Sequence, residues 1–414
     1  MKYIVIGAGS RGTIYGNWAF QHSIEIAAVA EIRPDRLAEA GKLWKVPENR
    51  LFTDVKDLFA LGKIADAAIV ATMDRDHYGH VMTALDLGYD ILLEKPISPD
   101  PRECMEIEAK ANALGKKITV CHVLRYTNFF GAIKDIIDSG ELGKVVAIKH
   151  SENIGNFHMA HSFVRGNWRN DVLSSPIIMQ KSCHDLDILL WLTGAHCTKV
   201  AAFGSLSYFK ESNAPANSTD RCCDCPVADN CRFNAKRCYL PTLGSWPTDV
   251  VCLEQTEEAL EEALRTGPYG RCVYRCDNNV CDHMSIILEF DNAVTATFSL
   301  TAQTSPCHRN IHIMCHDGEI IADDGDRQIL VRKHVSSQAD TFEERVINVR
   351  TNASGHGGGD AGIMEDFTAS LSENAQTRSA ISASVESHLM ACAIEEARLT
   401  GTVVSMTDFR NSLT

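Results

Sequence analysis

The first third of the chain alternates short apolar runs with longer segments of helical periodicity. Runs long enough for buried parallel strands occupy residues 3–6, 26–30, 67–71, 89–93 and 117–121. Between them apolar residues recur at helical spacing, as in residues 34–44 and 101–114. Alternating strands and helices predict an α/β fold with a parallel sheet and right-handed crossovers.

The first apolar run leads into Gly7-Ala8-Gly9-Ser10-Arg11-Gly12, a G-x-G-x-x-G that opens a helical segment. The first glycine permits a tight turn, the second lets the backbone approach a pyrophosphate, and the third allows close helix–strand packing. Glu31 ends the next run, where a carboxylate would accept from the ribose of NAD. The stretch predicts a dinucleotide site; the alternative is a structural glycine turn in another α/β fold.

Four further side chains follow the later runs of this parallel sheet. Ligands of such sheets bind outside the carboxyl ends of the strands. We therefore expect Thr72, His77, Glu94 and Lys95 on the cofactor edge.

Beyond residue 121 the pattern changes to longer alternating segments and irregular polar stretches. Strand candidates occupy residues 145–154, 200–208, 285–290, 293–300, 310–315, 319–322 and 328–333. Asp291-Asn292 is typical of a hairpin turn, and residues 382–399 form a strong helix candidate. This half predicts a second, α+β domain with a large, mostly antiparallel sheet that has one open face.

Composition narrows the partners and the compartment. The 414 residues carry a net charge of −14 and no basic stripe, which argues against a nucleic-acid partner. No apolar run reaches the ~20 residues of a membrane span, and no signal-sequence pattern stands at the start, so we expect a cytoplasmic protein. Its 16 cysteines are then expected as thiols or metal ligands rather than disulfides.

Two later motifs make a family resemblance specific. Glu94-Lys95-Pro96 ends one run, and His184-Asp185-Leu186-Asp187 precedes an apolar helix that closes with Trp191-Leu192-Thr193-Gly194. With the glycine-rich turn, they make the chain similar to the glucose–fructose oxidoreductase/inositol dehydrogenase/rhizopine-catabolism (Gfo/Idh/MocA) family. The resemblance implies a Rossmann domain at 1–121 and a substrate domain at 122–414, whose late helices pack back toward the cofactor domain. It also implies NAD(P)-linked chemistry on a carbohydrate and a homo-oligomer, dimer or tetramer.

Lys95 and His184 resemble the family's active-site lysine and histidine. Removing a hydride from a CHOH carbon needs a base for the hydroxyl proton and positive charge near the forming alkoxide. An imidazole pKa near ~6.5 suits a base better than an amine near ~10.4, and a nearby ammonium favours the neutral imidazole. We expect His184 as base and Lys95 as electrostatic and proton-relay residue. The alternatives are a solvated lysine and a helix-terminal histidine without a special role.

One position departs from the family's pattern. Many of its sugar dehydrogenases carry an aspartate four residues before the histidine, where this chain has Gln180. Glutamine can hydrogen-bond a sugar hydroxyl but cannot take a proton. Lys181 is either a second positive charge, suited to an acidic or carbonyl-bearing substrate, or an exposed lysine.

Three further residues are candidates for substrate binding. Arg125 matches a family position near the cleft. Arg165 and Trp168 combine a bidentate donor with an aromatic platform, as sugar sites do. The alternative is a salt-bridging loop between domains.

A polar insertion near residues 213–282 contains a group of cysteines. Four thiolates could hold a structural zinc that orders a segment too polar to form its own core; the expected ligands are Cys222, Cys225, Cys231 and Cys238. Cys272, Cys276 and Cys281 are alternative ligands. The competing interpretation is a reduced, thiol-rich loop without metal.

Three functions remain open on this basis. The first is an NAD-dependent dehydrogenase acting on a CHOH group of a sugar, polyol or sugar derivative. The second is a glycosidase of the same superfamily that keeps NAD bound, and the third is a non-catalytic NAD-binding protein. Glu31 favours NAD over NADP, although Arg33 could pair with a 2′-phosphate.

Overall fold

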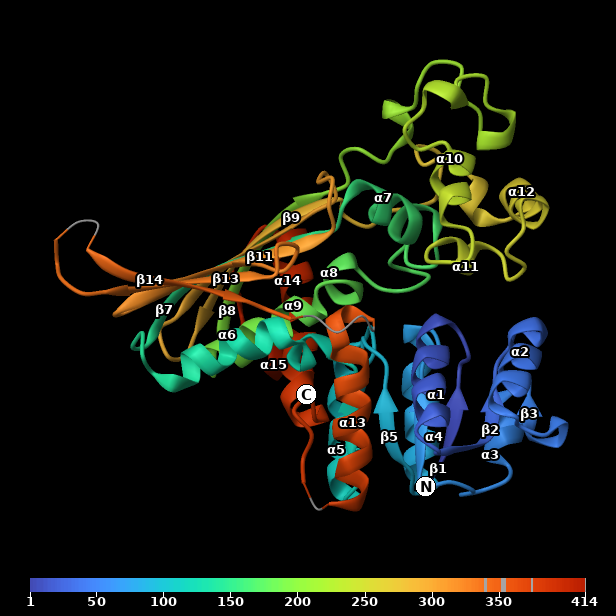
Figure 1. The fold of residues 1–414 in the computed structure, drawn as a ribbon, viewed down its shortest axis with the longest axis horizontal. Coiled ribbons are helices and arrows are strands. Elements are labelled where there is room, and N and C mark those ends of the chain that lie inside the picture. Colours follow the sequence, from blue (N-terminus) through green and yellow to red (C-terminus); the bar gives the residue numbers. More distant parts are fainter. Residues whose placement is uncertain (339–340, 351–354, 374, 414) are drawn as a thin grey trace.

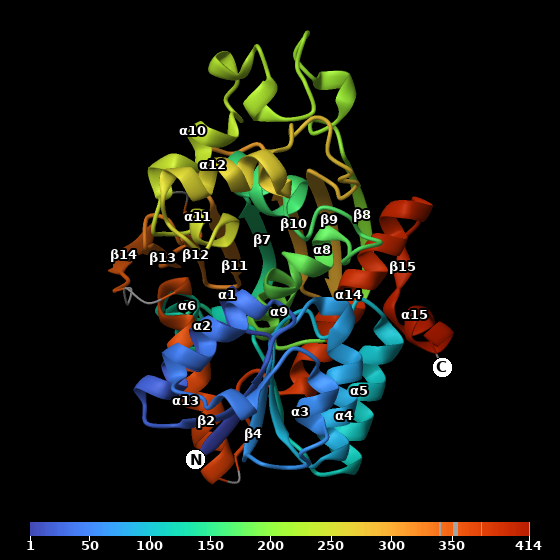
Figure 2. The same ribbon diagram turned by 90° about the vertical axis from the view of Figure 1, so that its right-hand side faces the viewer.

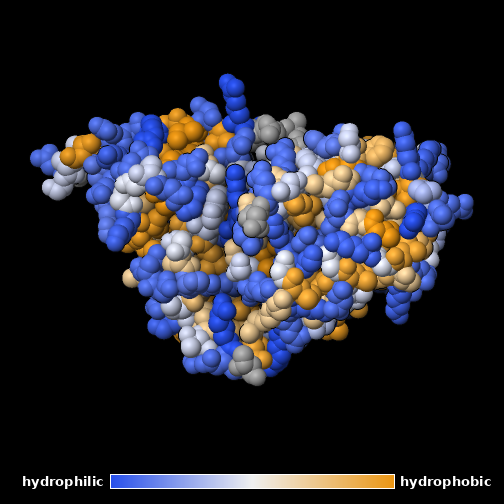
Figure 3. Space-filling view, turned by 90° about the horizontal axis from the view of Figure 1, so that it is seen from below, coloured by the Kyte–Doolittle hydropathy of each residue, from blue (hydrophilic) through white to orange (hydrophobic). Residues whose placement is uncertain are grey.

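The computed structural model describes residues 1–338, 341–350, 355–373 and 375–413. Two sheets organise the molecule, a six-stranded sheet near the N-terminus and a nine-stranded sheet beside it (Figures 1 and 2). Seen from below, the surface mixes hydrophilic side chains with smaller hydrophobic areas (Figure 3). Among the described residues, no helix combines the length and apolar character needed to cross a membrane.

The six-stranded sheet is entirely parallel, in the order β3-β2-β1-β4-β5-β6. This order reverses between β1 and β4, which is the switch point of a dinucleotide-binding sheet. Its strands are β1 Lys2–Ile6, β2 Glu25–Ala30, β3 Leu51–Phe52, β4 Ala67–Val70, β5 Asp90–Leu93 and β6 Ile118–Val120.

Helices cross over between these strands, as the alternating pattern predicts. They are α1 Ser10–Gln21, α2 Pro34–Trp44, α3 Val55–Phe59, α4 His77–Asp86 and α5 Pro101–Ala113. Local chemistry sets where they begin. The carboxylates of Asp54 and Asp100 accept from Lys56 N and Arg102 N at the starts of α3 and α5.

The nine-stranded sheet is antiparallel except where β7 and β10 run side by side in parallel, in the order β14-β13-β12-β11-β7-β10-β9-β8-β15. Its strands are β7 Val145–Asn153, β8 Cys197–Ser205, β9 His283–Phe290, β10 Thr295–Thr301, β11 His308–Cys315, β12 Gly318–Asp323, β13 Gln328–His334, β14 Phe342–Asn348 and β15 Val404–Ser405. The predicted fold class is confirmed.

One face of this sheet is covered by helices and the other is open (Figure 1). Side chains alternate strictly between exposed and buried along β9. Phe203 and Ile287, on the open face, are 72% and 60% exposed. The remaining helices of the domain are α6 Asn128–Ser139, α7 Asn156–His158, α8 Ile177–Gln180, α9 Cys183–Thr193, α13 Gly359–Ser372, α14 Ile381–Thr400 and α15 Met406–Leu413.

The cysteine-containing insertion folds into short helices above the junction of the two sheets (Figures 1 and 2). They are α10 Ala235–Tyr239, α11 Thr248–Val251 and α12 Glu257–Thr266. The segment has a small core of its own, made of Ala235, Tyr239, Leu260, Leu264 and Tyr269. The expectation that it is too polar for a core is therefore wrong.

Helix α13 packs against the first domain although it comes late in the chain. Ile363, Met364 and Phe367 share a core with residues of β1 and α1. Lys117 Nζ donates to Glu373 O at 2.8 Å, and Val120 N donates to Ser379 O at 2.9 Å. Residues from 363 to 379 thus pack on the first sheet although they come late in the chain.

Candidate active site

The three glycines of the turn after β1 differ in their surroundings. A Cβ on Gly7 would lie 2.6 Å from Ala71 O, and one on Gly12 would lie 1.9 Å from Gly7 O, so packing within the protein requires both glycines. A Cβ on Gly9 would meet nothing within 4 Å. Gly9 also precedes α1 without a side-chain cap, which leaves free N–H groups at the helix start. This open, uncapped cradle fits a pyrophosphate.

Glu31 places a carboxylate beside the glycine-rich turn. Glu31 is 9% exposed, and its carboxylate accepts from Ala8 N at 2.7 Å and from Arg33 N at 3.0 Å. The Arg33 guanidinium pairs with Asp35 at 2.6 Å. The arrangement fits a ribose diol at Glu31, with the Arg33 cation already matched by a carboxylate.

Arg11 ties the glycine-rich turn to distant parts of the chain. Its Nε donates to Glu94 at 2.7 Å, and its Nη2 donates to Asp360 at 2.6 Å. Tyr15 also donates to Glu94, at 2.8 Å. Arg11 therefore links the glycine-rich turn to Glu94 after β5 and to Asp360 in α13.

His77 connects the ends of two strands. Its Nδ1 lies 2.7 Å from Pro96 O and its Nε2 lies 3.2 Å from Thr72 O. The Thr72 hydroxyl lies 3.1 Å from His80 Nδ1. His77 is only 1% exposed, so it supports the ends of β4 and β5 from within the protein.

Lys95, Gln180 and His184 come together where the two domains meet. Lys95 Nζ donates to Gln180 O at 2.8 Å. The Gln180 side chain donates to Ser175 O, and its Oε1 is buried without a partner among the described residues. That oxygen can accept a hydrogen bond but cannot donate one.

His184 lies in the first turn of α9 and is 7% exposed. Burial, and then the positive charge of Lys95, hold the pKa of His184 well below its ordinary value. The neutral imidazole is therefore the favoured form at physiological pH. Lys95 lowers the pKa of His184, as expected, but burial lowers it more.

Lys181 belongs to a buried group of charges that we call the charged network. It consists of Lys181, Glu152, Arg309, Asp185 and His150. Lys181 lies 3.2 Å from Glu152, whose other ion pair is with Arg309. Arg309 also pairs with Asp185 at 2.7 Å, and His150 bonds Asp185 at 2.8 Å. The Lys181 side chain keeps 15% exposure, so it is neither fully exposed nor unpaired.

The other substrate candidates are engaged elsewhere. Arg125 makes two bonds of 2.7 Å to Asp187 and one of 2.9 Å to Arg378 O. Arg165 is 1% exposed and donates to Phe233 O and Arg271 O at the base of the insertion. Trp168 lies on the following loop, 38% exposed.

The cysteines do not form a recognisable metal site. All 16 are free thiols. Within the described ranges, no three His, Cys, Asp or Glu side chains are grouped to hold a metal ion. Three of the four expected ligands line a narrow cavity of about 20 Å³ together with Cys272, but Cys238 does not. Zinc is therefore not supported, and the insertion's own core removes the reason for expecting it.

Several site residues were missed from the sequence. His122 lies two residues after the end of β6, as Lys95 lies two residues after the end of β5, so the strand-end rule would have indicated it as well. Glu152 and Arg309 carry no such signal, because they become direct neighbours only through the pairing of β7 with β11.

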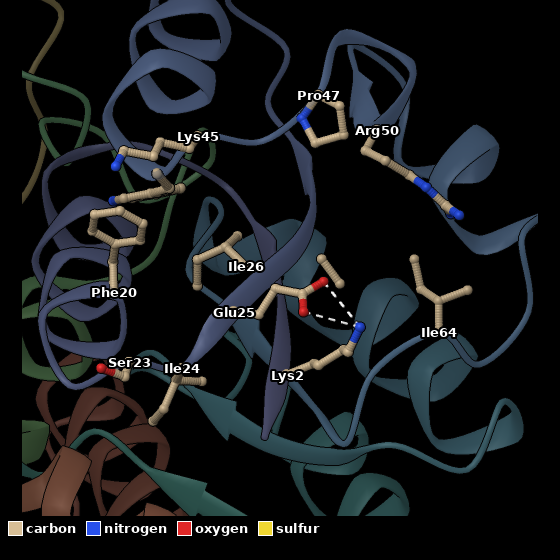
Figure 4. A pocket seen from close by; sticks show the side chains of 12 residues that line it. Lys2, Phe20, Ser23, Ile24, Glu25, Ile26, Lys45, Pro47, Arg50 and Ile64 are labelled. Carbon is tan, nitrogen blue, oxygen red and sulfur yellow. Dashed lines mark hydrogen bonds and ion pairs between the residues drawn. The ribbon is translucent and has the colours of Figure 1, made fainter.

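A wider depression of about 500 Å³ lies at the opposite edge of the first sheet (Figure 4). It is lined by residues at the amino ends of β1 and β2, where Lys2 and Glu25 form an ion pair of 2.9 Å. Because parallel sheets bind ligands at their carboxyl ends, the depression is separate from the candidate active site.

The fold and the cradle together define a dinucleotide-binding protein with a Rossmann domain. Residues 1–122 match the family model for the NAD-binding Rossmann fold of the Gfo/Idh/MocA oxidoreductases, and residues 134–406 match the model for their C-terminal α/β domain. The chain belongs to the Gfo/Idh/MocA family.

Individual relatives are distant. YteT of Bacillus subtilis (strain 168), named as an oxidoreductase, is 26% identical over 84% of this chain and 83% of its own length. Inositol 2-dehydrogenase of Corynebacterium glutamicum (strain ATCC 13032) is 25% identical over 47% of this chain and 55% of its own, about half of that enzyme. An Agrobacterium radiobacter oxidoreductase, solved with NAD+, L-tartaric acid and magnesium, has the same fold, with a TM-score of 0.70, 15% identity and 99% of each chain covered.

Proposed function

We propose that this protein is an NAD-dependent dehydrogenase that oxidises a CHOH group of a sugar, polyol or sugar derivative. The observation that carries the proposal is a neutral, nearly buried His184 beside Lys95, at the sheet edge where the cradle would hold the nicotinamide. Inositol 2-dehydrogenase among the relatives supports the substrate class.

Each residue has a distinct part in this reaction. The cradle from Gly7 to Gly12 would bind the pyrophosphate and Glu31 the ribose, and the bound nicotinamide would take the hydride. His184 would take the hydroxyl proton. The Lys95 side chain donates to a neutral acceptor, Gln180 O, so its ammonium would orient the hydroxyl oxygen and stabilise the forming alkoxide.

Gln180 would select the substrate rather than move protons. Its Oε1 is buried without a partner among the described residues and can only accept a hydrogen bond. Such an acceptor favours a substrate with a second hydroxyl next to the one that reacts. Lys181 would be held by Glu152 at the border of the site. The preference for NAD rests on Glu31, which would repel a 2′-phosphate.

The second candidate is a glycosidase that keeps NAD bound, oxidises a sugar carbon transiently and returns the hydride after the aglycone leaves. Gln180, in place of the aspartate typical of sugar dehydrogenases, favours keeping it.

A panel of free sugars, polyols and aryl glycosides tests both candidates. A dehydrogenase produces NADH stoichiometrically from a free sugar or polyol, measured by absorbance. A glycosidase releases the aglycone without net NADH. A protein that binds NADH but turns over neither class would contradict both and favour a binding protein. Light scattering of the same preparation tests the proposed dimer or tetramer.

A further inference from the structure

Two histidine rings meet behind the candidate active site without hydrogen bonds. His122 is 0% exposed, and its ring stands edge-on to His184, with centroids 5.7 Å apart and planes at 78°. Within the part of the chain that the structure describes, His122 Nδ1, His122 Nε2 and His184 Nδ1 are buried without a hydrogen-bond partner. Buried polar atoms are nearly always paired, so three such nitrogens at one contact need a reason.

Charged and titratable groups face His122 from every neighbouring element. They are Arg125 on the same turn, Glu94 and Lys95 after β5, Asp187 and His184 on α9, and His388 on α14. Burial, and then the charges of Arg125 and Lys95, hold the pKa of His122 well below its ordinary value. His122 is therefore neutral, with one N–H and one bare nitrogen.

A single placement of protons would let each of the three nitrogens bond a neighbour if the contacts shortened. His122 Nε2 lies 3.9 Å from Asp187 Oδ1, so the His122 proton belongs on Nε2, facing that carboxylate. His122 Nδ1 is then bare and would accept from His184 Nδ1–H, a bond that is not closed in this structure. Such bonds are often long without ligand and tighten in the working complex. Arg125 holds Asp187 through two bonds of 2.7 Å.

We propose that His122 is the positioning residue of His184. By accepting from Nδ1–H, it selects the tautomer of His184 whose Nε2 is bare and can take a proton. Asp187 orients His122 in turn, so a base is oriented by a third group through an intermediate ring. The proposal rests on the role proposed for His184 as base. Without His122, the tautomer protonated on Nε2 becomes populated, and that tautomer cannot accept the proton.

The tautomer of His184 can be measured directly by NMR of the full-length protein with ¹⁵N-labelled histidine rings. The His184 signals are assigned by their loss in His184→Gln. We expect the Nδ1–H form in the unaltered protein and a mixture of tautomers in His122→Phe. His122→Asn should restore the Nδ1–H form, since its side-chain oxygen can stand in for Nδ1.

His388 provides a matched control. Its ring lies 5.6 Å from His122, but its Nε2 accepts from Ile97 N and its Nδ1 donates to Ser384 O. His388→Phe should lower the stability of the protein without changing the tautomer of His184.

Two results would overturn the proposal: a proton on Nε2 of His184 in the unaltered protein, or an unchanged tautomer in folded His122→Phe. If His122→Phe does not fold, the unaltered protein and His122→Asn still give the answer. With a substrate in hand, kcat of His122→Phe should fall about 10-fold or more with little change in KM. Absence of turnover on the whole panel would contradict the proposed function, whereas the tautomer measurement needs no turnover.

Discussion

The glycine-rich turn and the charged network handle charge in opposite ways. The turn prepares for an anion with backbone N–H groups from one short stretch, residues 7–12, at the start of α1. The network balances its charges with side chains from β7, α9 and β11, which are far apart in the sequence. The turn is open to a ligand, whereas Glu152 and Asp185 are 0% exposed.

The difference teaches which part of a site depends on neighbours in the chain and which on neighbours in space. Backbone donors work wherever the local conformation is correct, so the turn depends mainly on its own residues. A buried side-chain charge is stable only while its partners are present. The following predictions, from the largest expected effect to the smallest, separate the two regions.

Glu152→Ala should damage the network most. It would remove the carboxylate paired with Lys181 and one of the two carboxylates paired with Arg309, and breaking a buried pair typically costs about 3–5 kcal/mol of unfolding free energy. Urea unfolding measures the loss. Glu289→Ala is the matched control, because it breaks an exposed pair with Lys199 and should change stability little. Equal losses in the two variants would contradict the buried role of the network.

Lys95→Ala and His184→Ala should lower turnover by about 10²-fold or more, the scale of removing one acid–base or electrostatic group. The Kd for NADH, from fluorescence titration, should stay near normal because neither change touches the glycine-rich turn. Unaltered turnover in either variant, on the substrate found by the panel, would remove that residue from the mechanism.

Asp360→Asn should loosen the clamp between α13 and the glycine-rich turn. Burial opposes ionisation of Asp360, but bonds from His356 and Arg11 outweigh it and hold the pKa of Asp360 well below its ordinary value. A carboxyl whose pKa is lower in the folded state than in the unfolded state, where it is ~4, stabilises the protein at pH values above ~4. This stabilisation is lost as the pH falls further. We expect the variant to lose about 2 kcal/mol at pH 7. The difference should shrink in denaturation experiments below about pH 4; a constant difference would contradict it.

Glu31→Ala should weaken NADH binding by about 10-fold, the scale of one hydrogen bond to a charged group, and weaken NADPH binding less. Paired fluorescence titrations with the two cofactors measure this. Asp35→Ala is the control that frees Arg33, and it should strengthen NADPH binding while leaving NADH unchanged. Similar affinities of the unaltered protein for both cofactors would refute the preference for NAD.

Much of the fold could be predicted because its signals are local. The helix expected at 34–44 is observed as Pro34–Trp44, and the Asp291-Asn292 turn joins β9 to β10. Strand β14 was missed because nearly all its side chains are exposed, which removes the alternation that marks a strand. Helix α12 was missed although Thr256, whose hydroxyl accepts from Ala259 N, is a typical N-cap.

The candidate site divides along the same line. Gly9, Glu31 and Lys95 lie in local motifs that sequence alone indicates. The structure pairs Arg125, a predicted substrate residue, with Asp187, a partner that no spacing rule indicates. Packing between distant residues decides such cases, and a single sequence does not contain it.

The late return of α13 to the first domain also affects the order in which the protein is made. The side chains of Ile363, Met364 and Phe367 complete a core that otherwise consists of residues 3–123. Ribosomes add about 5–20 residues per second, so the intervening stretch of about 240 residues takes roughly 10–50 s to synthesise. During that time the apolar surface against which α13 packs stays uncovered, and the ion pair between Arg11 and Asp360 cannot form. The domain that leaves the ribosome first is completed among the last.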